Sequence, residues 1–153
     1  MFGPPGHLYV YRSYGMHWCA NAVCGPAGTA GAVLVRALAP VAGVEMMRAA
    51  RMDRRDRDLA SGPGRLCQAL GIDGSYDGAD IVAGRGGVAI AMDGTAPPVA
   101  AANGPRVGIS AAVDWPWRWW VEGEPCVSRA RTSGTRTPGA ITTGHRTPGS
   151  ERR

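Results

Sequence analysis

Two tyrosines near the N-terminus, Tyr11 and Tyr14, have the residue type and spacing for a chemical task. The runs Leu8–Tyr11 and His17–Asn21 are rich in strand-forming residues, and Ser13–Met16 between them holds the Tyr-Gly pair of a tight turn. This pattern predicts a β-hairpin with one aromatic ring at its tip and a second ring one strand inward. A protein that separates stacked bases and holds one of them needs such a wedge and such a surface.

Arg36 is a second residue with possible chemistry, because its surroundings are apolar. The run Ala32–Ala39 predicts a strand whose alternation puts Leu34, Arg36 and Leu38 on one face. A charge on such a face needs a partner, since an unpaired buried charge is costly. That partner is either one of the eleven acidic residues within 1–128 or a group in a functional site.

The remaining segments predict a mixed α+β domain. Helices are expected at Gly43–Arg51 and from Ser61 to Leu70, the second with Ser61 as its cap, Pro63 in its first turn and Gly71 as its stop. Further short strands are expected at Val88–Met92, Arg106–Ile109 and Arg118–Val121. The expected fold is a single domain with a curved, largely antiparallel sheet, flanking helices and a protruding hairpin near the N-terminus.

Charge divides the 153 residues into two parts, 1–128 and 129–153. The first part balances eleven arginines against eleven acidic residues, whereas the second holds six arginines and a single acid, so the net charge of +5 falls there. The second part is also poor in large apolar residues, which predicts a disordered basic tail. A basic tail favours contact with nucleic acid in general.

The four cysteines, Cys19, Cys24, Cys67 and Cys126, lack the spacing of a metal site or an obvious disulfide framework. Cys19 and Cys67 lie in apolar runs and are expected to be buried thiols. The N-terminus does not have the pattern of a signal peptide, and no apolar run is long enough to cross a bilayer. We therefore expect a soluble, cytoplasmic protein without membrane contacts.

The tryptophans 115, 117, 119 and 120 could be read as a base-stacking surface. Their alternation around a short strand is more typical of core packing, and core packing is the prediction.

Five motifs, in order, resemble those of the 3-methyladenine (alkyladenine) DNA glycosylase family: LYVYRSYGMHWCANAV (8–23), VLVRAL (33–38), SGPGRLCQALGI (61–72), PRVGIS (105–110) and WPWRWWVEGEPCVS (115–128). The resemblance runs from Met1 to about Ser128. It implies a DNA repair enzyme of base excision repair, a hydrolase that flips an alkylated purine out of duplex DNA and hydrolyses its N-glycosidic bond. It also implies a monomer that acts on double-stranded DNA containing damaged bases with water as the nucleophile, and with no cofactor or metal.

The resemblance also implies roles for single residues. Tyr14 would be the wedge that enters the minor groove, with Met16 beside it. Tyr11 would stack on the flipped base, Asn21 would obstruct the 2-amino group of guanine, and Leu34 would line the base pocket. From the residues alone, Tyr11 could equally be a core aromatic, and Asn21 could sit at a sheet edge and bond to the backbone.

Arg36 and Val107 would be the catalytic positions, because in the family they hold the attacking water, Arg36 with its side chain and Val107 with its carbonyl. Arg36 would also lie near the sugar phosphate. The family's general base is a glutamate in an ETEAY-like segment that precedes residues like Met1–Gly6, accompanied by a histidine and a second pocket tyrosine. The sequence as printed holds no such segment, and Glu45, Glu122 and Glu124 do not match its position. We expect either a glycosylase whose activity depends on that segment or a non-catalytic DNA-binding remnant of the family.

Overall fold

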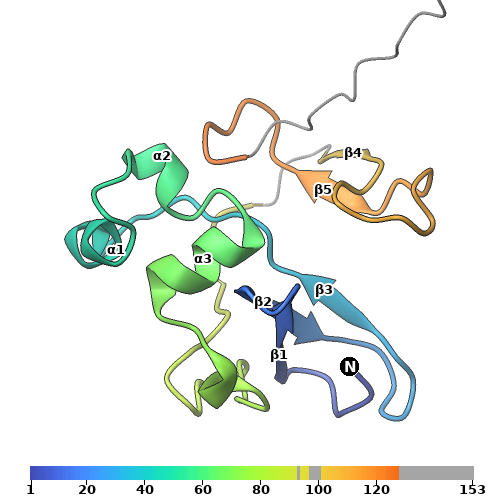
Figure 1. Cartoon of the computed structure of the whole chain (residues 1–153). Helices are drawn as coiled ribbons and strands as arrows, with labels where there is room; N and C mark the ends of the chain where they lie inside the picture. The colour runs from blue at the N-terminus through green and yellow to red at the C-terminus, as the bar shows by residue number, and fades with distance from the viewer. Residues whose placement is uncertain (93, 97–100, 128–153) are drawn as a thin grey trace, which may run out of the picture.

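The computed structural model describes residues 1–92, 94–96 and 101–127 (Figure 1). The tail predicted at 129–153 lies outside the described residues. The elements are β1 (Leu8–Ser13), β2 (His17–Val23), β3 (Ala32–Leu34), α1 (Val44–Ala50), α2 (Asp56–Leu59), α3 (Pro63–Leu70), a 3₁₀ helix η1 (Gly74–Tyr76), β4 (Ala102–Gly104) and β5 (Arg118–Trp120). The fold is α+β, as predicted, with antiparallel strands in two sheets.

The first sheet has the strand order β1-β2-β3, and both pairs are antiparallel. The predicted hairpin is confirmed, with Leu8 opposite Ala22 at its base and Ser13 opposite His17 at its end. β3 is shorter than the predicted strand. The segment leaves β2 after Val35 and turns toward the helices, so that the backbone N–H of Leu38 bonds to Ala60 rather than to a strand.

The core lies between one face of this sheet and α3. Figure 1 shows α3 packed beside β2. The sheet contributes Leu8, Val10 and Ala20, and α3 contributes Leu66 and Cys67, all almost fully buried. Burial of a side chain such as Leu66 stabilises the fold by about 1.5–3 kcal/mol, so this contact is what fixes the orientation of the sheet on the helix.

Helix α3 begins and ends close to the predicted positions. Gly71 adopts φ 67° and ends the helix, as expected from its sequence. The cap is Gly62, however, not Ser61 as predicted. The Ser61 hydroxyl instead donates to the carbonyl of Asp58 (3.3 Å) and accepts from the side chain of Arg65 (2.9 Å), so it does not cap the backbone of the helix.

The second sheet pairs β4 with β5, with Asn103 opposite Trp119. The strand predicted at 118–121 is therefore confirmed, while those predicted at 88–92 and 106–109 are wrong. In the first of these segments the N–H of Ile90 donates to the carbonyl of Ile81, but no ladder of strand hydrogen bonds forms. The second contains Gly108 at φ 75°, a left-handed conformation that interrupts an extended run.

The prediction that the tryptophans form a core is also wrong. Trp115, Trp117 and Trp119 are more than half exposed. Trp115 and Trp117 pack edge to face on each other at 4.3 Å, and the guanidinium of Arg106 lies 5.5 Å from the Trp117 ring. Because these rings pack on each other and on cations, they do not need the interior that the sequence pattern suggested.

Cys19 and Cys67 are buried, as predicted, and all four thiols are free. Within the described residues, no helix has the length and apolar character needed to cross a membrane.

Candidate functional site

The hairpin tip exposes two large apolar side chains. Tyr14 is 85% exposed and Met16 68% exposed. Tyr14 and Gly15 both have positive φ, 49° and 66°, and the N–H of Met16 donates to the carbonyl of Ser13 (3.0 Å). Positive φ at both central positions marks a type I′ turn, which favours Asn and Gly over a bulky residue. A tyrosine is therefore held exposed in a backbone conformation that costs on the order of 1 kcal/mol.

The sheet face opposite the core gathers the residues predicted for the base pocket. Tyr9, Asn21 and Leu34 lie directly across from one another on β1, β2 and β3. Tyr11 follows Tyr9 by two residues, so it lies on the same face. The rings of Tyr9 and Tyr11 stack, with centroids 5.6 Å apart and planes at 16°. The strand register thus brings Tyr11, Asn21 and Leu34 to one surface.

Asn21 is 6% exposed in the central strand β2. The edge position considered for it is therefore wrong, although its side chain does bond to the backbone. Its Nδ2 donates to the carbonyl of Tyr9 at 3.2 Å. A buried amide with a fixed donor direction is a rigid floor beside the two rings.

Tyr11 lies on this same face, two residues beyond Tyr9 and opposite Cys19. Burial raises the pKa of the Tyr11 hydroxyl, and the hydrogen-bonded Cys19 raises it further, while the nearby Arg36 opposes both effects. Burial likewise raises the pKa of the Cys19 thiol. Both groups therefore stay neutral near pH 7, and Arg36 is the charged group that acts on them.

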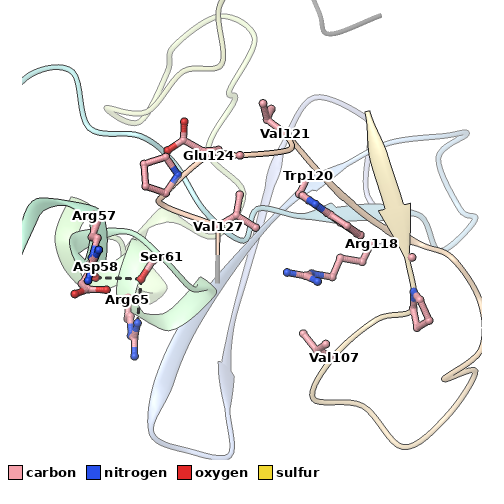
Figure 2. A pocket seen from close by; sticks show the side chains of 14 residues that line it. Arg57, Asp58, Ser61, Arg65, Val107, Arg118, Trp120, Val121, Glu124 and Val127 are labelled. Atoms are coloured by element: carbon pink, nitrogen blue, oxygen red, sulfur yellow. Dashed lines mark hydrogen bonds between the residues drawn. The ribbon is translucent and has the colours of Figure 1, made fainter. Parts of the chain in front are cut away.

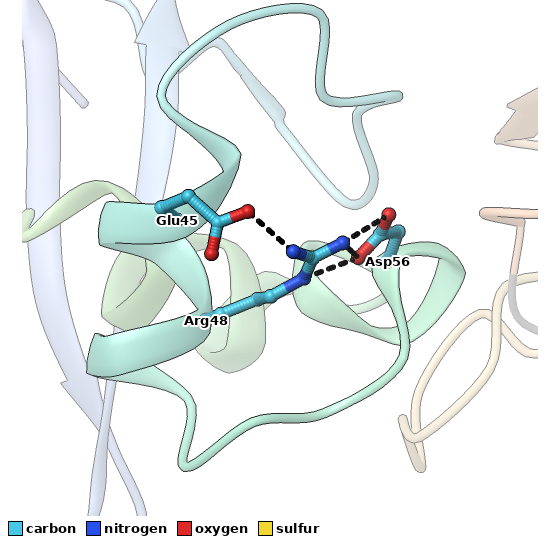
Figure 3. Close-up of polar contacts among 3 residues, drawn as sticks. All are labelled: Glu45, Arg48 and Asp56. Carbon is cyan, nitrogen blue, oxygen red and sulfur yellow. Dashed lines mark hydrogen bonds and ion pairs between the residues drawn. The ribbon is translucent and has the colours of Figure 1, made fainter.

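Arg36 is half-buried, and its pKa is lowered first by that burial and then by repulsion from Arg118. The structural ion pair considered for it is not found: the ion pairs among the described residues are formed by Arg48 and Arg55. Figure 3 shows Arg48 held between Glu45 and Asp56, with its Nε 2.8 Å from Asp56. Glu45 is therefore engaged away from Arg36.

Val107 lines a cleft of about 1100 Å³ between the helices and the second sheet. Figure 2 shows Asp58, Ser61 and Arg65 on one wall and Arg118 with Trp120 on the other. Tyr11, Asn21 and Leu34 do not line this cleft. Arg118 lines this cleft and repels Arg36, and this repulsion couples the cleft electrostatically to the base-pocket face.

Sequence reasoning missed Arg118 as a site residue. It is only 9% exposed, and its guanidinium lies 4.7 Å from the Trp120 ring. The available signal was a single arginine inside the aromatic run WPWRWW, a pattern that indicates a cation held against rings. In the part of the chain that is described, no group of three or more His, Cys, Asp or Glu side chains is arranged to hold a metal ion.

The chain is similar in sequence to known proteins. The sequence pattern of the methylpurine-DNA glycosylase (MPG) family matches residues 1–125. A protein from Burkholderia cenocepacia with the provisional name 3-methyladenine DNA glycosylase is 60% identical over 131 residues, which cover 85% of this chain and 63% of the relative. Relatives with the same provisional name in Nitrosospira multiformis and Streptomyces avermitilis are 49% and 48% identical, with 65% and 63% of their lengths covered. The chain thus spans less than two thirds of these relatives.

Proposed function

Because the chain belongs to the methylpurine-DNA glycosylase family, we propose that it binds double-stranded DNA at an alkylated purine and hydrolyses the N-glycosidic bond of that base. The base would first swing out of the helical stack, since the bond is not accessible inside a duplex. The proposal includes a role in base excision repair as a cytoplasmic monomer that needs no cofactor or metal.

The observation that carries this proposal is the exposed ring of Tyr14 at a left-handed position of the hairpin tip. A ring that projects from a rigid turn can fill the space that a displaced nucleotide leaves. Filling that gap offsets part of the few kcal/mol that unstacking costs. Met16 projects beside it and adds apolar area to the wedge.

The pocket for the displaced base would be the face of Tyr11, Asn21 and Leu34. Alkylation gives a purine positive charge, which strengthens its attraction to the flat face of Tyr11. The buried amide of Asn21 would obstruct a 2-amino group, and this would favour adenine-like purines. Support comes from the shared face and from the hydrogen bond that fixes Asn21.

Arg36 would bind the sugar phosphate and position the attacking water, with the carbonyl of Val107 as a second partner. A half-buried guanidinium that is repelled by Arg118 has a strong need for an anion, and a DNA phosphate supplies one. The proton of the water would pass to a carboxylate within hydrogen-bond reach. We assign that role to none of the described glutamates: Glu45 is bound to Arg48, Glu124 accepts from the N–H of Cys126, and Glu122 does not match the position of the family's base.

The test is an assay of purine release from methylated duplex DNA by the 153-residue chain, with the freed base measured by chromatography. Release above the level of an Arg36→Gln variant supports the enzyme. A second candidate function is lesion binding without catalysis, and it is favoured by the lack of an ion pair between Arg36 and any described carboxylate. Binding to the methylated duplex without release would establish this second function, and neither binding nor release would exclude both.

A further inference from the structure

A groove of about 910 Å³ on the helical side of the hairpin is not used by the proposed chemistry. Its charged lining consists of Arg51, Arg54, Arg55, Arg65 and Asp58, and His17 from the start of β2 also lines it. We call these six residues the arginine groove. Its polar lining is completed by the loop that leads into α3.

Positive charge in the arginine groove exceeds negative charge. Asp58 is its only acidic lining residue, and it is paired with Arg55, whose Nε lies 3.0 Å from the carboxylate. Arg54 forms no hydrogen bond or ion pair with another described residue. Arg51 feels repulsion from both Arg54 and Arg65, which lowers its pKa after the larger effect of burial. Arg51 donates to the carbonyl of Leu59 and to Gln68, and Arg65 donates to Ser61, but these partners are uncharged. The charges of Arg51, Arg54 and Arg65 thus lack a matching number of acids, a pattern that fits a polyanion.

The arginine groove begins where the hairpin ends. A Cβ added to Gly64 would lie 2.9 Å from the Cβ of His17, so a glycine is needed for α3 to approach the hairpin this closely. His17 pairs with Ser13, the residue directly before Tyr14. A residue of the groove therefore lies at the end of the hairpin that carries Tyr14.

The start of α3 adds to this positive potential. Its first turn has no side-chain cap, and Pro63 leaves the N–H groups of Gly64 and Arg65 as the first free donors. Backbone donors at a helix N-terminus attract phosphate. Here they face a groove that already carries uncompensated guanidiniums, so two independent features favour the same ligand.

We propose that the arginine groove holds the phosphodiester backbone of duplex DNA on one side of the wedge. The identity of the partner rests on the proposed function. Contacts of this kind fix the register of a protein on the duplex without reading its bases. The groove shares Asp58 and Arg65 with the cleft that contains Arg118, so a backbone could follow positive charge from the hairpin toward that cleft.

The experiment measures the affinity of the full chain for a fluorescent duplex at several salt concentrations, with and without a methylated purine. Each phosphate contact contributes about 0.9 to the slope of log K against log salt. Arg54→Ala should lower the magnitude of this slope by about 1, and the double variant Arg54→Ala, Arg65→Ala by about 2, equally for both duplexes. Arg54→Lys should keep the slope. Arg85→Ala removes the same charge from an exposed position outside both cavities and should also leave the slope unchanged.

The outcomes separate this inference from the proposed function. An unchanged slope in both alanine variants, or an equal loss in Arg85→Ala, would overturn the arginine groove while lesion preference stands. A reduced slope in a protein that does not prefer the methylated duplex would support the groove and refute the proposed function. A wild-type chain that binds neither duplex overturns both. The thermal transition of each variant checks folding, and Arg54→Ala alone decides the case if Arg65→Ala unfolds by losing its bond to Ser61.

Discussion

The side-chain amide of Asn21 donates a hydrogen bond to the main-chain carbonyl of Tyr9, with 3.2 Å between Nδ2 and the oxygen. The bond crosses from β2 to β1 at the point where the two residues are directly opposed. It satisfies a buried polar group and fixes the amide beside the stacked rings of Tyr9 and Tyr11. One contact therefore serves both the sheet and the proposed pocket.

Replacement of Asn21 tests how much this hydrogen bond contributes to the stability of the fold. Asn21→Ala should lower the free energy of unfolding by about 1–2 kcal/mol, because the buried carbonyl loses a donor and the pocket gains a void. Asn103→Ala is the matched control, since Asn103 is exposed on β4 and its loss should cost less than about 0.5 kcal/mol. Urea unfolding followed by circular dichroism measures both. Equal costs for the two variants would show that the Asn21 bond is not important for stability.

Replacement of Tyr14 should separate stability from function. Tyr14→Asn puts the preferred Asn-Gly pair into the type I′ turn, so the free energy of unfolding should rise by about 0.5–1 kcal/mol. The same variant loses the exposed ring and should bind a methylated duplex at least about tenfold more weakly, as expected for about 1.4 kcal/mol of lost stacking. Calorimetry and fluorescence anisotropy provide the two measurements. A variant that gains stability and retains its lesion affinity would refute the wedge.

The hairpin and α3 were predictable because their signals are local. A Tyr-Gly turn between strand-forming runs, and a Pro and a Gly at the two ends of a helix, act through the backbone of adjacent residues. The pairing of β4 with β5 was only half predicted, because Asn103 meets Trp119 across a long loop. Alternation in the tryptophan run could not tell an interior from a surface where rings and cations cover one another.

The candidate site was likewise predictable only where its signals are local. Tyr11, Asn21 and Leu34 share a face because the short turn pairs Ser13 with His17 and side chains then alternate with a period of two. The repulsion between Arg118 and Arg36 couples β5 to the segment that follows β3, and no local pattern encodes an interaction between residues so far apart in sequence. The arginine groove was missed for a similar reason, because its arginines come from 51–55 and from α3, and no local pattern shows that these two segments meet.

Arg36 should contribute to activity at a cost to stability. Its pKa is lowered by burial and by Arg118, so its charged form is less favourable in the folded chain than in the unfolded one. Arg36→Gln should therefore leave the free energy of unfolding unchanged or raise it, while purine release falls about 100-fold or more. Arg48→Gln is the control with the opposite sign, because it breaks the contacts with Glu45 and Asp56 and should only destabilise. A clear loss of stability in Arg36→Gln would mean that a favourable partner offsets its burial.

Cys67 should make the fold sensitive to alkaline pH. Burial, with a smaller contribution from the nearby Cys19, raises the pKa of this thiol from 9.0 to about 11. A raised pKa means that the folded chain holds the proton more tightly than the unfolded chain. The stability that results is fully present below pH 9 and is lost as the pH rises toward about 11, by at most about 1.4 kcal/mol per pH unit.

Cys67→Ala also leaves a void in the core, which lowers stability at every pH. The contribution of the Cys67 thiol is therefore isolated by comparing how steeply the free energy of unfolding falls with pH in the variant and in the wild-type chain. Urea unfolding at steps from pH 8 to pH 11 should show stability falling less steeply in Cys67→Ala than in the wild-type chain. The remaining slope belongs to Tyr11, Cys19 and Cys126, whose pKa values are also raised. A thiol reagent at pH 8 gives an independent check, since exposed Cys24 should react long before Cys67. Equal slopes, together with rapid modification of Cys67 in the folded chain, would show that this thiol is not held in the core beneath the hairpin.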